Sequence, residues 1–334
     1  MSSNRVAKPV IFLLGAGFNA DAASEAGCQG TLLPDRYPLV SDLLKICFKR
    51  DALPFNKSIE ELFQESIDRG ETQPLETLYD IIMKADLYIA PRLKRGESHD
   101  NNIYTRFLRD FPKSPLITFN YDSLPEILLL AENSWSPKDG YGVPVQAHQR
   151  TIRKGPLPIE ESLRPVLHLH GSLCIDTSTY YFAKQPEHNY PIMQDYNEPK
   201  FLFDPERLGN CFSPFERILP SLNYTEPFKR VIAPIPDKAE GLNGEFVTAV
   251  YNKAVELLNT ASQIVAIGYS FNRNDRASYA QLLDRVADKP VLLVAPDAGT
   301  LIKRLAQEHS NIPWEAKSMT FKEWVNNGYP GVRK

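Results

Sequence analysis

A short apolar run that ends in glycines constrains the fold of this chain more than any other feature. Residues 10–14 are continuously apolar and are followed by Gly15, Ala16 and Gly17. Such a run is typical of a strand buried on both faces of a parallel sheet. Residues 19–26 are alanine-rich and compatible with a helix. A strand, a glycine turn and a helix start can form a phosphate site, because free N–H groups at the helix end face the anion.

The spacing of the turn leaves two interpretations open. Gly15, Gly17 and Ala20 fit the pattern G-x-G-x-x-G/A of dinucleotide-binding sheets. The same pattern occurs where a glycine turn only packs a helix against a sheet. A dehydrogenase would also carry an acid at the end of a second strand, about 20 residues on. Asp35 lies near that distance, but in a proline-flanked loop without a clear strand before it. The chain is therefore a poor match to a hydride-transfer enzyme.

The composition is ordinary for a soluble globular protein. The 334 residues are 43% hydrophobic and 24% charged, enough for one large or two ordinary domains. A net charge of −3 provides no basic field, so we expect no direct nucleic-acid binding. We see no signal peptide and no apolar run near the roughly 20 residues of a membrane span, and we expect a cytoplasmic protein without membrane contact.

The cysteines do not indicate a metal site. Cys28, Cys47, Cys174 and Cys211 lack the paired spacing of zinc ligands. In a cytoplasmic protein we expect them to be reduced thiols.

The apolar periodicity predicts an α/β fold. Strands are expected at 10–14, 115–119, 165–169, 263–267 and 291–294, and helices at 123–131, 246–259, 275–287 and 299–308. This alternation predicts a Rossmann-like parallel sheet covered by helices on both faces. Residues 58–111 have helical spacing without a strand, so residues 40–111 are interpreted as a helical insertion or simply as covering helices. Residues 134–163 and 176–244 are predicted to be long irregular loops, the latter with short helices.

Polar residues follow the carboxyl end of each predicted strand. The segments are Gly15-Ala16-Gly17-Phe18-Asn19, Asn120-Tyr121-Asp122, His170-Gly171-Ser172, Gly268-Tyr269-Ser270 and Pro296-Asp297. Ligands of open parallel sheets bind at this edge. One such loop would be uninformative, but the whole set predicts a ligand site there.

These segments, with Pro34-Asp35-Arg36, resemble the motifs of the sirtuin superfamily in their order. The resemblance covers roughly residues 8–300 and is strongest to the bacterial sirtuin-like branch associated with defence against phage. It implies one sirtuin-like domain over residues 1–334 that consumes NAD by cleaving the nicotinamide–ribose bond. For such an activity we expect control through a homo-oligomer, a phage trigger or a partner defence subunit, such as a helicase-like ATPase or an Argonaute-like protein.

Two departures from the family are informative. Deacylase sirtuins carry a zinc module with two Cys pairs, and this sequence has no such pairs and therefore no expected metal. Asn19 stands where many relatives have Ser. The missing module favours NAD hydrolysis over protein deacylation. A deacylase and a non-catalytic module that senses NAD or ADP-ribose are the alternatives.

Three residues are the predicted catalytic groups. Asn120 carries an uncharged amide that can hold a ribose hydroxyl or the attacking water. His170 has an unperturbed pKa of about 6.5, so it can act as a base near neutral pH. Asp122 faces the nicotinamide carboxamide or caps the following helix. His168 shares a strand face with His170, but without further ligands nearby we interpret it as a structural histidine.

The remaining contacts are predicted on the nucleotide. Gly268 lets the backbone approach a phosphate and Ser270 donates to it. Asp297 accepts from the adenine ribose or caps a helix, and Arg36 pairs with a phosphate or with Asp35. The predicted NAD-binding set is Gly15, Ala16, Gly17, Asn19, Asp35, Arg36, Tyr121, Gly268, Ser270 and Asp297.

Overall fold

The computed structural model describes most of the chain. The described residues are 8–28, 33, 36–93, 102–147, 161–183, 192–203, 234, 236, 238, 245–286 and 288–333, with only the backbone at 146–147, 176–183, 192–203 and 277. Asp35 and Cys211 from the sequence analysis lie outside these residues. Among the described residues, no helix combines the length and the apolar character that crossing a membrane requires.

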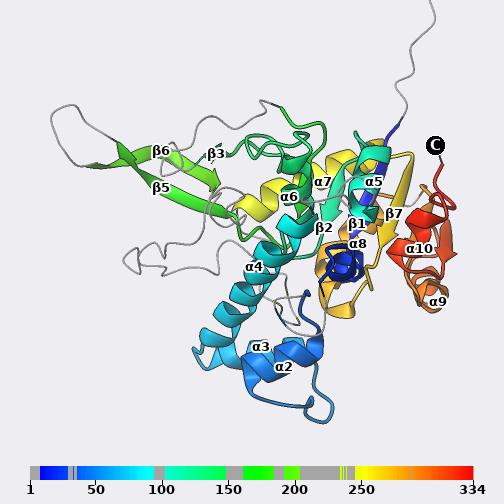
Figure 1. Cartoon of the computed structure of the whole chain (residues 1–334), viewed down its shortest axis with the longest axis horizontal. Helices are drawn as coiled ribbons and strands as arrows, with labels where there is room; N and C mark the ends of the chain where they lie inside the picture. The colour runs from blue at the N-terminus through cyan, green and yellow to red at the C-terminus, as the bar shows by residue number, and fades with distance from the viewer. Residues whose placement is uncertain are drawn as a thin grey trace, which may run out of the picture.

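A six-stranded parallel sheet forms the centre of the fold (Figure 1). Its strands are β1 (Val10–Leu14), β2 (Leu116–Thr118), β4 (Val166–His168), β7 (Gln263–Ile267), β8 (Val291–Val294) and β9 (Trp314–Lys317). Their order across the sheet is β4-β2-β1-β7-β8-β9. The chain thus extends the sheet outward from β1 on one side and then on the other, which is the order of a doubly wound Rossmann sheet. This confirms the predicted fold class.

The strand order reverses between β1 and β7. These strands pair in parallel from Val10 opposite Gln263 to Leu14 opposite Ile267. The chain leaves their carboxyl ends toward opposite halves of the sheet. In sheets of this order, ligands bind outside the carboxyl ends at this switch point.

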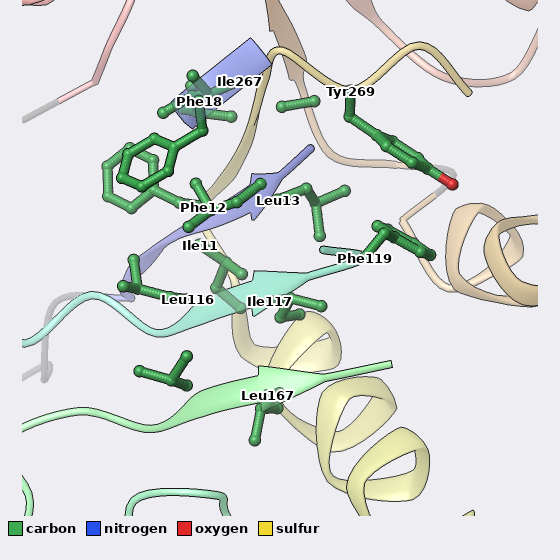
Figure 2. Packing of buried hydrophobic residues seen from close by; sticks show 14 of the residues in the cluster. Ile11, Phe12, Leu13, Phe18, Leu116, Ile117, Phe119, Leu167, Ile267 and Tyr269 are labelled. Atoms are coloured by element: carbon green, nitrogen blue, oxygen red, sulfur yellow. The ribbon is translucent and has the colours of Figure 1, made fainter. Parts of the chain in front are cut away.

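Both faces of the central strand are buried. Every residue of β1 is at most 9% exposed, and successive side chains point to opposite faces, so helices must cover both. On one face the Phe12 ring contacts Phe107 and Phe111 edge to face, with centroids 4.8 and 4.9 Å apart. Figure 2 shows Phe12 on β1 with the apolar side chains of Leu116 and Ile117 on the neighbouring strand β2. The sheet is therefore a rigid platform for the loops at its edge.

The crossover from β1 to β2 contains a group of helices. They are the single-turn helices η1 (Ala16–Asn19) and α1 (Ala22–Glu25), then α2 (Val40–Phe48), α3 (Ile59–Asp68), α4 (Gln73–Leu93) and α5 (Ile103–Asp110). Figure 1 shows α2 and α3 at the end of α4 that lies far from the sheet. Phe63, Leu75 and Leu78 belong to a second apolar cluster shared by these helices. The segment predicted as an insertion, 40–111, contains α2 to α5.

The remaining helices cover the later strands. They are α6 (Leu124–Ala131), α7 (Glu245–Thr260), η5 (Arg273–Asp275), α8 (Arg276–Asp284), α9 (Ala298–Glu308) and α10 (Phe321–Asn326). The sequence analysis did not predict β9 or α10. All residues of β9 are half-buried at the edge of the sheet, so β9 lacks the apolar run that marks the inner strands.

The prediction that 176–244 is irregular with short helices is wrong for part of that segment. β5 (Ile175–Ala183) and β6 (Ile192–Phe203) form an antiparallel pair, and β3 (Gln146–Ala147), inside the predicted loop 134–163, adds to β6 in parallel. The register shifts between Ser178, opposite Lys200, and Tyr180, opposite Asp195. Pro199 lies in the unpaired stretch between those partners, where a missing N–H is tolerated. The irregular register and the proline interrupt the alternation by which a strand is recognised.

Candidate active site at the carboxyl edge of the sheet

Glycines join the two loops at the switch point. The N–H groups of Gly15 and Gly17 donate to the carbonyls of Ile267 and Gly268, both at 3.0 Å. A Cβ on Gly17 would lie 2.7 Å from the Gly268 Cα. Gly268 has a φ of +58°, and a Cβ there would lie 2.4 Å from the Gly17 Cα. The glycines therefore serve backbone-to-backbone packing, and Ala16 at the tip of the turn is exposed.

Asn19 and Asp122 form a buried pair beneath this turn. The Asn19 Nδ2 donates to the Asp122 Oδ2 at 2.6 Å, and the Leu124 N–H donates to Oδ1 at 3.2 Å. Asp122 thus makes the cap-like contact at the start of α6 that was one of its two predicted roles. Burial raises the pKa of Asp122 to about 6, although the bonds from Leu124 and Asn19 oppose this. The Asn19 Oδ1 is buried without a hydrogen-bond partner in the described part of the chain.

Asn120 connects the β2 loop to the glycine turn. Its side-chain Nδ2 donates to the Gly15 carbonyl at 3.1 Å, and the residue is half-buried, as is Tyr121. Its own backbone carbonyl lies 3.3 Å from the His168 Nδ1. Asn120 is therefore held through both its side chain and its backbone, and the residue remains partly exposed.

His168 is a fully satisfied histidine, in agreement with its predicted structural role. Its Nε2 lies 2.5 Å from the Glu126 Oε1, and both side chains are completely buried. Desolvation alone would lower the pKa of His168, but the charge and hydrogen bond of Glu126 raise it above its ordinary value. Because the other ring nitrogen of His168 contacts the Asn120 carbonyl, the Glu126–His168 pair holds the backbone of Asn120 in place.

His170 is buried in a different environment. The strand β4 ends at His168 and His170 lies in the turn that follows, so the prediction that the two histidines share a strand face is wrong. Its ring contacts the rings of Phe119 and Tyr121, with centroids 5.3 and 5.8 Å away, so it packs against both neighbours of Asn120. Burial and the nearby charge of Lys238 lower the pKa of His170 to about 3. The imidazole is therefore neutral near pH 7, with a pKa well below the value assumed from the sequence.

Sequence reasoning missed a group on the β7 side of the site. The Asp275 Oδ1 lies 3.7 Å from the His170 Nε2 and is ion-paired with Lys238. The Tyr269 hydroxyl donates to the Asp275 Oδ2 at 3.4 Å, and the Tyr269 ring stacks on Phe119 at 4.1 Å. Figure 2 shows Phe119 and Tyr269 together at the carboxyl ends of the strands. Asp275 starts a helix after the Gly268 loop, which was the available signal, whereas no pattern marks Lys238.

Of the other predicted contacts, Ser270 and Asp297 follow the carboxyl ends of β7 and β8, whereas Arg36 lies just before α2. Ser270 and Asp297 are exposed, and Asp297 occupies the N-cap position of α9 without a side-chain capping bond. Arg36 forms a bidentate pair with Asp42, with N–O distances of 2.5 and 2.7 Å, at the start of α2. This ion pair, not predicted from the sequence, raises the pKa of Arg36 and occupies the guanidinium.

Within the described residues, no group of three or more His, Cys, Asp or Glu side chains could hold a metal ion. The chain matches no protein-family model, and a comparison with curated proteins yields no significant match. The chemistry of the sheet edge is thus the guide to function.

Proposed function

We propose that this protein hydrolyses NAD at the nicotinamide–ribose bond and releases nicotinamide and ADP-ribose. One observation carries the proposal. Asn120 lies between Phe119 and Tyr121, whose rings both contact the buried, neutral imidazole of His170, at the edge of a sheet whose strand order is that of dinucleotide-binding folds. The sirtuin-like order of the edge motifs supports the same reaction.

The residues suit the chemistry of this cleavage. When the C1′–N bond breaks, its electron pair returns to the nicotinamide nitrogen, and the ribose carbon becomes oxocarbenium-like, as in glycoside hydrolysis. Water then bonds to C1′ through its oxygen and must release one proton. His170 is neutral, and its Nε2 has no hydrogen-bond partner among the described residues, so it is free to take that proton.

Asn120 supplies orientation without charge. Its carboxamide both donates and accepts, and its contact with the Gly15 carbonyl holds it in one position. In this proposal it binds a ribose hydroxyl or the attacking water. The buried Asn19 Oδ1 next to Asp122 is a further acceptor that suits the N–H₂ of the nicotinamide carboxamide.

Unregulated consumption of NAD would kill a cell, so we infer that the activity is gated. The gate is self-assembly, a phage trigger or a partner defence subunit, and the protein acts in the cytoplasm as an effector of abortive infection. A helicase-like ATPase or an Argonaute-like protein is the partner class that the family resemblance suggests.

Purified protein should be incubated with NAD, and the products separated by mass spectrometry. We expect nicotinamide and ADP-ribose, and we expect Asn120→Ala and His170→Ala to reduce the rate by about 100-fold or more. An acetylated peptide should be added in parallel, because O-acetyl-ADP-ribose would identify a deacylase instead. Calorimetry with NAD is the second measurement. Tight binding without turnover, with every plausible activator present, would indicate a sensor, and neither binding nor turnover would overturn the proposal.

A further inference from the structure

We propose that Asp275 is the positioning residue of His170, and that Lys238 competes with His170 for the same carboxylate oxygen. The inference concerns residues on opposite sides of the switch point, since His170 follows β4 and Asp275 follows β7. Its consequence for catalysis rests on the proposed function, whereas its electrostatic part does not.

The geometry centres on one atom, the Asp275 Oδ1. The His170 Nε2 lies 3.7 Å from it, and the Lys238 Nζ is ion-paired with it. The side chains of His170, Asp275 and Lys238 are only 3%, 11% and 6% exposed. The distance to the neutral His170 exceeds a hydrogen bond, but it is short enough for the carboxylate to stabilise the positive charge that forms when His170 takes a proton.

The carboxylate is held firmly in place. Its Oδ2 accepts from the Tyr269 hydroxyl, and Tyr269 is itself fixed by stacking on Phe119. The turn that carries Asp275 is capped by Asn272, whose Oδ1 accepts from the Asn274 N–H at 3.1 Å. The Asn272 Nδ2 in turn donates to Glu60 of α3 at 3.0 Å. Asp275 is thus preorganised before any ligand binds.

The groups around the imidazole explain the competition. From the β2 loop, His170 meets the Phe119 backbone and the Tyr121 ring, and His168 lies two residues before it. From the β7 side it meets Asp275, which is beside Tyr269. The remaining charged neighbour is Lys238, which is ion-paired with Asp275. Burial and the cation of Lys238 lower the pKa of His170, while the carboxylate of Asp275 raises it. Because Lys238 neutralises Asp275, little of the anionic charge is left to stabilise an imidazolium.

This arrangement sets the strength of the base. When His170 takes a proton, the positive charge forms beside Asp275, so the carboxylate stabilises the state that follows proton transfer. A base works best when its pKa approaches the working pH. Weakening the contact between Lys238 and Asp275 should therefore raise the pKa of His170 and make it a stronger base. Removing the Asp275 carboxylate as well should cancel that increase.

The direct test is an NMR titration of the His170 ring in labelled protein. Lys238→Met should raise the pKa of His170 by about 1 to 3 units, because the carboxylate then lacks its cation. Lys238→Met with Asp275→Asn should return it toward the wild-type value. The double variant is used since Asp275→Asn alone leaves Lys238 buried without its carboxylate. An equal pKa in the single and double Lys238 variants would overturn the proposal.

Activity provides the second readout. The acidic limb of the pH profile of NAD cleavage should move to higher pH in Lys238→Met and back in the double variant. The double variant should also lose about 10- to 100-fold in kcat relative to Lys238→Met, the range known for groups that orient a functional histidine, with little change in KM. An unmoved limb in Lys238→Met would contradict this part.

Asp288→Asn is the matched control. Asp288 is a surface acid, 84% exposed, which pairs with Lys289 at 3.1 Å, and we expect it to change neither readout. If the wild-type protein neither binds nor cleaves NAD, the proposed function fails, and the titration still decides the role of Asp275.

Discussion

Two buried histidines on the same strand end lie in opposite environments. His168 faces the β2–α6 side, where Glu126 and the Asn120 carbonyl engage both ring nitrogens. His170, two residues later, faces the β7 side, where its Nε2 meets a carboxylate already paired with Lys238. The pKa of His168 is raised and that of His170 is lowered. The same type of side chain is one half of a buried pair in one region and, under the proposed function, the base in the other.

The difference separates stability from activity. A buried ion pair resists the loss of either partner, because the remaining charge has no counter-ion. The Nε2 of His170 has no hydrogen-bond partner among the described residues, so this nitrogen adds little to stability, and unpaired buried groups of this kind are typical of functional sites. The predictions below test this division.

The largest effect is expected for His170→Gln. The substitution keeps most of the volume and removes the base, so NAD cleavage should fall by about 100- to 10,000-fold. The free energy of unfolding should change by less than about 1 kcal/mol, because the ring nitrogen that faces Asp275 makes no hydrogen bond among the described residues. Product formation and urea unfolding check the two parts. A large loss of stability with retained turnover would reverse the division between the histidines.

His168→Leu should act mainly on stability. It leaves Glu126 buried without its partner, which costs about 3–5 kcal/mol of unfolding free energy. The control is Glu126→Leu combined with His168→Leu, in which no charge remains buried. Urea unfolding should show the double variant to be more stable than the single one. A less stable double variant would show that the interaction between Glu126 and His168 contributes more free energy than the burial of the two side chains costs.

The sequence predicted the inner sheet well. The limits of β1, β7 and β8 agree with the apolar runs, because strands buried on both faces are apolar throughout. The strand order could not be predicted from such runs. The paired β5 and β6 were missed because Pro199 and a register shift obscure their alternation.

The site was predicted less completely than the fold. Each predicted edge residue follows its own strand, so local pattern was enough to find Asn120 and His170. Glu126, Asp275 and Lys238 act through partners far away in the chain: Glu126 on His168, and both Asp275 and Lys238 on each other and His170. No spacing rule connects such positions. The direction of each histidine pKa depends on these partners, and so only the structure shows it.

A smaller effect is expected at the glycine contact that joins the two sides of the site. Gly268→Ala combines a left-handed φ with a Cβ 2.4 Å from Gly17, whereas Gly70→Ala has a φ of +72° and nothing within 4 Å. Both variants should lose about 1–2 kcal/mol from the backbone conformation. Gly268→Ala should lose about 1–3 kcal/mol more from overpacking, with reduced NAD binding. Thermal unfolding and calorimetry measure the two losses, and equal losses of stability would show that the close packing is not needed.

The smallest effect concerns the pH dependence of stability, to which His170 and Asp122 contribute with opposite signs. The pKa of His170 is lowered to about 3 in the folded protein. As the pH falls, the unfolded chain therefore binds this proton first. The free energy of unfolding then decreases below about pH 6.5, by at most about 1.4 kcal/mol per pH unit. Since the pKa of Asp122 is raised from 3.8 to about 6, the folded protein binds that proton first, and stability rises as pH falls through this window. The two slopes therefore cancel in part between about pH 4 and 6.

Asp122→Asn should remove the compensating slope. The neighbouring Asp86 acts in the same sense, because burial and then the charge of Asp122 raise its pKa. Urea midpoints measured at several values between pH 7 and 4.5 should therefore fall more steeply in Asp122→Asn than in the wild type, and less steeply in His170→Gln. Parallel curves for all three proteins would mean that neither group titrates differently on folding. The environments of His170 and Asp122 would then be closer to water than their burial indicates.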